Sequence, residues 1–529
     1  MFRIVTGFFV SMAAAAPLPA AADEPILPSR GEQLAATYCL ACHTVPEPTA
    51  LPRESWEFCL TYMGMFLGFH DQTQLDSFSA EEQAILEARR DFIATAELLP
   101  ASPVISDEDW ALLRRYYLEA APVEAIPQIP HPAPVESRSA FRLMPTQYRR
   151  GQALTSLVHI DEERRQIILH DGLAEELTIM DRTGDIIATH PSPGVVLVDA
   201  KFAGNDVYLL SIGDLFASRI GEGFGELQRA RMIGGQIYGL QVLLKDLHRS
   251  TSLDLADIDG DGFQDALIGN FGDYTGNLSL FRGTPGNRSF QPQPVILSAA
   301  PGIVAAEAFD FNADGRQDVV VLASHAREEL SLLIQNPDGS FTPQSIVTQP
   351  SSFGYTGMLL RDFNDDGHMD IVTLNGDNGD SDPYNTLKAH HGIRIYLNRG
   401  GLKFEESYFY PMHGVFGAEI EDFDRDGDLD IAAIAFHPDF GQSPPENFVL
   451  LRQATSLQFE PITHPATYPG RWITIDSGDL DGDGDPDLIL GAGYSPVGLR
   501  FKYPDLLESM MNDGPALLVL KNQLASSSD

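Results

Sequence analysis

Two cysteines and a histidine near the N-terminus form the most informative chemical group of this sequence. Residues 39–43 read CLACH, a C-x-x-C-H motif made by Cys39, Cys42 and His43. At this spacing two thiols add to the vinyl groups of a porphyrin, and the following imidazole binds the iron. The motif predicts one haem c, attached covalently through Cys39 and Cys42 and with His43 as an iron ligand.

Other uses of a C-x-x-C pair fit the sequence less well. A thioredoxin-like motif belongs in a βαβ unit, and none surrounds it here. A structural zinc site needs four ligands, whereas the chain has three cysteines. The third, Cys59, is expected to be a buried core thiol, with oxidation or pairing to another chain as the minor alternative.

The second axial ligand of the iron has three candidates, Met63, Met65 and His70. Trp56, Cys59 and Met63 follow helical spacing and share one face, so we expect Met63 to bind the iron, with Met65 as the alternative. A thioether ligand raises the reduction potential relative to a second histidine. Either methionine would otherwise be ordinary core packing.

Five acidic segments repeat along the second half of the chain. They share the pattern D-x-[DN]-x-D-G-x-x-D, and their first residues are separated by 53, 52, 60 and 57 positions. Such a loop curls its side chains around a hard cation, and the glycine at position 6 permits the sharp turn. The sequence therefore predicts about five Ca²⁺ ions. The expected ligands occupy positions 1, 3, 5 and 9: Asp257, Asp259, Asp261, Asp265, Asp310, Asn312, Asp314, Asp318, Asp362, Asn364, Asp366, Asp370, Asp422, Asp424, Asp426, Asp430, Asp479, Asp481, Asp483 and Asp487.

Short apolar runs such as DVVVLA and DLILG follow each acidic loop and are typical of buried strands, which excludes an EF-hand. The repeat resembles the FG-GAP or VCBS repeats of integrin-alpha-like β-propellers, in which such loops bind Ca²⁺. The resemblance extends from about Asp254 to Asn522 and weakens upstream. Counting back at the same period predicts seven blades, five with calcium sites and two without.

The N-terminal part has a different character. Its first helix would enter the C-x-x-C-H motif, and residues 106–122 would form a closing helix with Ser106 as its N-cap. This arrangement resembles a monohaem cytochrome c domain, which implies that the carbonyl of Pro46 accepts from the His43 ring. The fold class is thus a small all-α cytochrome c domain followed by an all-β seven-bladed propeller. The expected segments are a signal peptide at 1–22, the haem domain at 29–121, a proline-rich linker at 122–140 and the propeller at 141–524.

The formal charge of −40 argues against a nucleic-acid partner. We expect no membrane span, and the signal peptide predicts a periplasmic or secreted protein. The favoured function is single-electron transfer to or from a redox partner protein or a small molecule, with the propeller docking the partner or holding a substrate. Two alternatives are an oxidoreductase whose substrate site lies on the propeller, and an integrin-like adhesion protein.

Four histidines form a weaker candidate site. His390 and His391 lie in a long insertion at 375–392, and His413 and His437 follow on later strands. Propeller loops gather at one end of the central channel, so these rings could converge on a transition metal or act as acid and base. We favour ordinary hydrogen-bonded histidines at strand ends, because neighbouring strand residues point to opposite faces.

Overall fold

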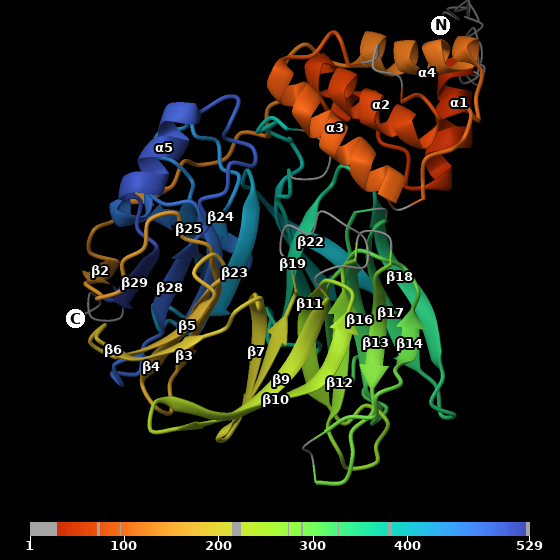
Figure 1. Ribbon diagram of the computed structural model, residues 1–529. Helices are drawn as coiled ribbons and strands as arrows, with labels where there is room; N and C mark the ends of the chain where they lie inside the picture. The colour runs from red at the N-terminus through yellow and green to blue at the C-terminus, as the bar shows by residue number, and fades with distance from the viewer. Residues whose placement is uncertain are drawn as a thin grey trace, which may run out of the picture.

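The computed structural model describes residues 29–70, 75–95, 97–213, 224–272, 275–286, 289–325, 327–378 and 383–524. The expected signal peptide at 1–22 lies outside these ranges. Four helices, α1–α4, stand over one end of a large ring of strands (Figure 1). Within the described residues, no helix is long and apolar enough to span a membrane.

The strands form seven sheets, so the predicted seven-bladed propeller is confirmed. The first blade contains β3 (Thr155–Asp161), β4 (Gln166–Asp171), β5 (Glu176–Asp181) and β6 (Ile186–Pro191). The second contains β7 (Leu197–Ala203), β8 (Asp206–Ser211), β9 (Gly225–Ile233) and β10 (Gln236–Leu247). The third contains β11 (Ser250–Ala256), β12 (Asp265–Asn270), β13 (Asn277–Phe281) and β14 (Val295–Ser298).

The fourth blade contains β15 (Ile303–Phe309), β16 (Asp318–Ala323), β17 (Glu328–Gln335) and β18 (Phe341–Gln349). The fifth contains β19 (Tyr355–Arg361), β20 (Asp370–Asn375), β21 (Gly392–Asn398) and β22 (Phe404–Pro411). The sixth contains β23 (Val415–Glu421), β24 (Asp430–Ala435), β25 (Phe448–Thr455) and β26 (Gln458–Thr463). The seventh contains β27 (Trp472–Gly478), β28 (Asp487–Ala492) and β29 (Leu517–Asn522), with helix α5 (Pro504–Asp513) between its last two strands.

The strand order explains the hydrophobic pattern. The first strands of neighbouring blades contact one another and form the inner ring. In blades three to seven the second strand follows the acidic loop, and all six of its residues are buried in each case. Such a strand lies between two partners in its own sheet and between two other blades, so both of its faces must be apolar. This is why the runs after the loops contain so many valines, leucines and isoleucines.

The segment before the propeller closes the ring. Strand β2 (Phe141–Met144) pairs antiparallel with β29, Phe141 facing Asn522, and thereby completes the seventh blade. Strand β1 (Val135–Glu136) adds parallel to β26 of the sixth blade. The proline-rich segment at 122–140 is also tied to the propeller by hydrogen bonds, with the Gln128 amide donating to the His391 carbonyl at 2.8 Å. The proline-rich linker therefore lies against the propeller.

The helical region contains α1 (Arg30–Tyr38), α2 (Arg53–Phe66), α3 (Ala80–Thr95) and α4 (Asp107–Ala120). Ser106 caps α4 by accepting a hydrogen bond from the Asp109 amide. Two apolar clusters hold the helices together. One surrounds Trp56 and Trp110 between α1, α2 and α4, and the other joins α2 to α3.

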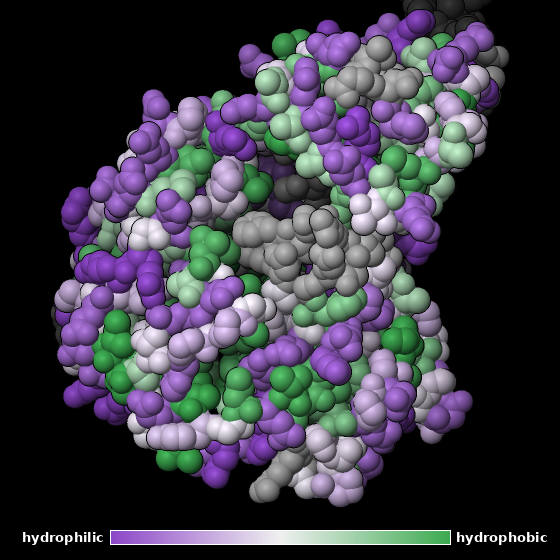
Figure 2. All heavy atoms as spheres, viewed as in Figure 1, coloured by the Kyte–Doolittle hydropathy of each residue, from purple (hydrophilic) through white to green (hydrophobic). Residues whose placement is uncertain are grey.

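Contacts between side chains attach the helical region to the propeller. The hydroxyls of Ser55 and Thr386 are 3.0 Å apart, and the Phe58 and Tyr384 rings meet edge to face with centroids 6.4 Å apart. Both propeller residues belong to the insertion at 375–392. Figure 2 shows hydrophilic residues spread over the viewed face of both parts. The insertion thus serves as a docking site for α2.

Candidate functional site

The C-x-x-C-H motif lies on a tight turn at the end of α1. The helix gives way to a 3₁₀ turn, Cys39–Ala41, and the amides of Cys42 and His43 both donate to the Cys39 carbonyl, at 3.1 and 3.2 Å. This turn brings two thiols and an imidazole to one side of the chain. All three side chains line the same cavity.

The cavity has a volume of about 420 Å³ and lies between the helical region and the propeller. This volume falls within the usual range for ligand pockets in proteins. Its helical wall is mainly apolar and includes Leu51, Trp56, Tyr62, Phe66 and Leu67, whereas its propeller wall is mainly polar. The propeller wall consists of Pro301, His325, Ser351, Ser352, Asn378 and Lys388.

The His43 ring is oriented by its Nδ1 atom. Nδ1 lies 2.8 Å from the carbonyl oxygen of Thr44 and 3.3 Å from the Ser351 hydroxyl, which comes from the propeller. The expected Pro46 carbonyl is not the partner, because it accepts from the Tyr117 hydroxyl at 3.1 Å instead. Burial lowers the pKa of His43 and keeps the ring neutral. With Nδ1–H donating to a carbonyl, Nε2 carries the lone pair that an iron ligand needs.

The two thiols of the motif are not joined in a disulfide. Burial, and then the neighbouring Cys42, raise the pKa of Cys39 to about 11. None of the three cysteines, all of which lie in the described part of the chain, forms a disulfide. Cys59 is buried in the cluster around Trp56 and also lines the cavity.

The candidates for the second axial ligand lie in different places. Met63 lines the cavity, whereas Met65 is 1 % exposed and packs with Phe58 and Leu86 in the other apolar cluster. Among the described residues that line the cavity, Met63 is the one methionine, and His70 is absent. The lining therefore includes the two thiols of the motif, the neutral His43 imidazole and the Met63 thioether, with Cys59 and His325 as further sulfur and nitrogen groups. That set fits a haem c.

Sequence reasoning missed the propeller wall of the cavity. His325 faces His43 closely enough to lower the pKa of that ring, although burial has the larger effect. Its backbone has φ = 85°, a conformation that is rare for residues other than glycine and that concentrates at functional sites. His325 lies two residues after the end of the buried strand β16, in a position that no repeat pattern distinguishes. Lys388 lies in the insertion that the sequence did single out.

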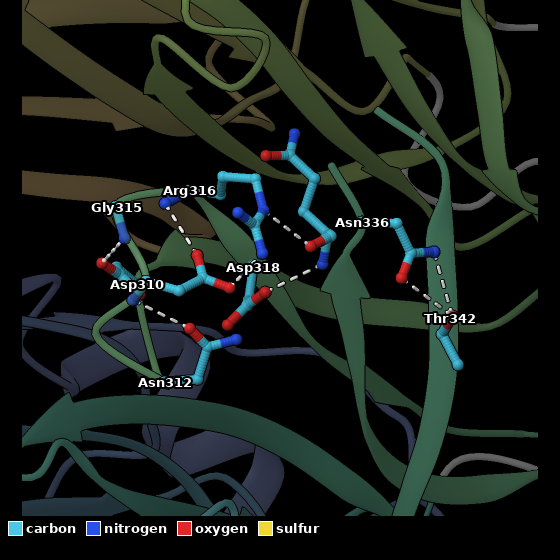
Figure 3. A network of polar contacts seen from close by, with 9 residues as sticks. Asp310, Asn312, Gly315, Arg316, Asp318, Asn336 and Thr342 are labelled. Carbon is cyan, nitrogen blue, oxygen red and sulfur yellow. Dashed lines mark hydrogen bonds and ion pairs between the residues drawn. The ribbon is translucent and has the colours of Figure 1, made fainter. Parts of the chain in front are cut away.

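The five acidic loops share one geometry, each between the first and second strand of blades three to seven. In the fourth blade the Asp314 amide donates to Asp310 at 3.0 Å and to Asn312 at 2.9 Å, and the Gly315 amide donates to Asp310 at 2.8 Å (Figure 3). Positions 4 and 6 have positive φ in every loop, which explains the glycine at position 6. The backbone therefore draws the side chains of positions 1 and 3 toward the centre of the loop.

The aspartate at position 9 has a structural role that the sequence did not reveal. Asp430 accepts from the Phe423 amide at 3.0 Å and from the Gln453 amide at 2.7 Å, so it ties the loop to the third strand of its blade. The equivalent Asp265 and Asp370 make the same two kinds of hydrogen bond. Burial, opposed by these bonds, raises the pKa of Asp430 to about 7, with the nearby Asp424 contributing.

Three loops bring three carboxylates within 4.8 Å of one another among the described residues. The groups are Asp257, Asp259 and Asp265; Asp422, Asp424 and Asp430; and Asp479, Asp481 and Asp483. The other two predicted loops have Asn312 and Asn364 at position 3, so they contribute one carboxylate fewer. All five loops offer clustered oxygen ligands of the kind that Ca²⁺ takes.

A buried lysine side chain lies against the acidic loop of the seventh blade. The Lys521 ammonium lies 2.9 Å from Asp487 and 3.3 Å from Asp481, and its side chain is almost fully buried. The first blade, which lacks the acidic repeat, uses a similar device: Arg164 pairs with Asp161 at 2.8 Å across the corresponding turn. A basic side chain can thus neutralise the turn between the first two strands of a blade.

The four histidines of the weaker candidate site do lie near one another. The fully buried His391 has its pKa lowered by burial first, and then by Lys388, His390, His413 and His437. Within the described residues, however, no group of three includes these rings at metal-binding distances. The His390 ring donates from Nε2 to the Ser352 carbonyl at 2.9 Å, and Nδ1 of His437 lies 3.2 Å from the Arg471 guanidinium. The cluster therefore resembles a packed interior and not a preformed metal site.

Comparison with known proteins identifies part of the propeller. Residues 257–321 and 310–373 match the family of FG-GAP-like repeats, and residues 472–502 match the FG-GAP repeat family. No curated protein matches the chain.

Similar solved structures include the N-terminal domain of Nup159, with 10 % identity over 75 % of this chain and 99 % of that chain at a TM-score of 0.42. A second match is a chain from the structure of S. cerevisiae Dbp5 bound to Nup159, Gle1, IP6 and ADP. It has 10 % identity over 75 % of this chain and 98 % of that chain, with a TM-score of 0.41. A putative 6-phosphogluconolactonase from Bacteroides uniformis has 12 % identity over 58 % and 83 %, with a TM-score of 0.40. At these scores the likeness carries no argument about function. The blades at 257–373 and 472–502 are FG-GAP repeats of a seven-bladed β-propeller.

Proposed function

We propose that this protein carries one covalent haem c in the cavity between its helical region and its propeller, and that it transfers single electrons. The observation that supports this most strongly is the shared cavity. Cys39, Cys42 and His43 all line it, and Met63 lines it as well. A bound haem c supplies one-electron chemistry at its iron, with a potential set by the axial ligands and the surrounding polarity.

Different residues of the chain would bind different parts of the haem. Cys39 and Cys42 provide the thiols for the two thioether links. Thr44 and Ser351 orient the His43 ring so that Nε2 faces the cavity, and Met63 offers its sulfur. The apolar side chains of α2 exclude water from this wall, which favours the thioether-ligated reduced state.

The propeller has two proposed roles in this function. Its polar wall closes the cavity, and its outer surface offers a docking platform for a redox partner, a use consistent with FG-GAP propellers as binding scaffolds. Ca²⁺ in the acidic loops would neutralise carboxylates that otherwise repel one another between the first and second strands of blades three to seven. The expected signal peptide is consistent with assembly outside the cytoplasm.

Covalent haem content tests the proposal. The purified exported protein should keep its Soret band after denaturation and acid–acetone extraction, and a pyridine haemochrome assay should give one haem per chain. Replacing Cys39 and Cys42 with serine should abolish the covalent haem, whereas the matched substitution Cys59→Ser should leave it attached. Extractable haem in the wild-type protein, or none at all, would refute the assignment.

A further inference from the structure

Lys388 is a buried cation that forms no ion pair with a carboxylate of the described residues. It is 6 % exposed, it lines the cavity, and it precedes β21 in the insertion that receives α2. Its ammonium donates one hydrogen bond, to the Asp377 carbonyl at 3.1 Å. No carboxylate in the described part of the chain forms an ion pair with it. A buried ammonium that lacks a counter-charge is costly, so the site favours an anion that the described residues do not supply.

The groups around Lys388 reinforce this property. The buried Asn378 lines the same cavity, and its Oδ1 atom has no hydrogen-bond partner. The NH₂ group of Asn378 donates one N–H to the Oδ1 atom of Asn385 at 3.5 Å, and its second N–H can donate to a ligand in the cavity. Burial, followed by the charge of Lys388, lowers the pKa of His390 to about 4, so that ring stays neutral. This corner of the cavity offers donors and one positive charge.

The positive charge of the described cavity lining is concentrated at Lys388. Of the described residues that line the cavity, Lys388 is the one lysine or arginine. The opposite wall consists of apolar and aromatic side chains from α2, among them Trp56 and Phe66. A ligand with a flat apolar body and an acidic edge matches this distribution. Such a ligand would place its body against α2 and its carboxylate against the propeller.

We propose that Lys388 and Asn378 form a carboxylate-binding subsite that the propeller contributes to the cavity, and that this subsite takes a propionate of the haem attached to Cys39 and Cys42. The inference rests on the proposed function. It makes the propeller part of the haem site as well as a docking platform. The same chemistry would also accept a small free carboxylate, which the experiment distinguishes.

The test uses the full-length, haem-loaded protein and the variants Lys388→Gln and Lys388→Arg. Lys403→Gln removes the same charge from an exposed position of the propeller and serves as the control. A propionate that loses its cation stabilises the oxidised iron. Lys388→Gln should therefore favour the oxidised state on the order of tenfold, which corresponds to about 59 mV for one electron. It should also shift the propionate bending bands in the resonance Raman spectrum, while Lys388→Arg and Lys403→Gln should stay close to the wild type.

Three results would overturn the inference. Unchanged potential and propionate bands in Lys388→Gln, at normal covalent haem content, would show that Lys388 does not contact a propionate. Equal shifts in Lys388→Gln and Lys403→Gln would indicate a general charge effect. A saturable spectral change when sodium succinate is added to the wild type, lost in Lys388→Gln, would assign the subsite to a free carboxylate. Absence of covalent haem from the wild type would instead refute the proposed function itself.

Discussion

The inner ring of the propeller contains a carboxylate whose removal should stabilise the fold. Glu307 is the fifth residue of β15, Asp254 is the fifth residue of the neighbouring β11, and Lys201 is the fifth residue of β7, one strand further round the ring. Burial, partly offset by Lys201, raises the pKa of Glu307 from 4.5 to about 6. The native state therefore binds more protons than the unfolded chain between these two values. By linkage, this group costs no stability below about pH 4, and its destabilising effect is complete above about pH 7.

The shift sets the size of the expected effect. A difference of 1.5 between the two pKa values corresponds to about 2 kcal/mol, and residual solvent screening reduces this to about 1–2 kcal/mol. Glu307→Gln should remove that cost at pH 8 and change little at pH 4, where the native carboxyl is already neutral. For a propeller of this size the corresponding rise in melting temperature is about 1–3 °C.

Differential scanning calorimetry at pH 4 and pH 8, with the same saturating Ca²⁺ in both, measures this effect. Glu124→Gln, on an exposed position of the proline-rich segment, is the matched control and should leave the melting temperature unchanged at both values. Destabilisation of Glu307→Gln at pH 8 would refute the reasoning. An equal stabilisation at pH 4 would do so too, since it would show that shape and not charge causes the change.

Three further predictions concern calcium and the axial ligand. Chelation by EGTA should lower the melting temperature of the propeller, because an ion that binds only the native state stabilises it. The double variant Asp422→Asn with Asp426→Asn should contain one Ca²⁺ ion fewer by elemental analysis. A melting temperature that EGTA does not change, in protein that contains no Ca²⁺, would contradict this prediction. Lys521→Gln should raise the Ca²⁺ affinity of the seventh-blade loop in calorimetric titration, because it frees Asp481 and Asp487 from an ammonium; unchanged or weaker binding would contradict it. Met63→Ala should abolish the weak ferric absorption near ~700 nm that accompanies thioether ligation. Met65→Ala should keep that band, and because Met65 is fully buried it should lower the free energy of unfolding by about 2–5 kcal/mol. The reverse outcome for the band would exchange the two methionines.

The propeller was largely predictable because its repeat is local. Each acidic loop, its glycine and the apolar run that follows lie within a dozen residues, and such short patterns define strand and turn directly. The blade count followed from the period alone, even for the two blades that lack the loop. The function of the position 9 aspartate was not predictable, because Asp430 accepts from Gln453, a partner on a strand 23 residues away.

The cavity was only half predictable. The motif at 39–43 and the helical face of Met63 identified its helical wall, since both depend on spacing within one segment. The propeller wall depends on how two regions dock. His43 and Ser351 are 308 positions apart, and nothing in the spacing of either one indicates the other. Lys388 lies in an insertion that stands out by its length, but a role for its charge could be inferred only after the structure showed that no described residue lining the cavity is a carboxylate.

The pairing of β2 with β29 has a consequence for how the protein reaches its folded state. The seventh blade joins residues 141–144 to residues 519–522, so its last strand is the final propeller segment that the ribosome makes. Contacts over such a separation form slowly, because the intervening chain must be ordered first. Until they form, β29 lacks its outer neighbour and presents an unpaired edge that attracts other chains. Ring closure is thus the step at which a nearly complete molecule is most exposed to aggregation, and any shortening of the C-terminus before Asn522 prolongs that exposure.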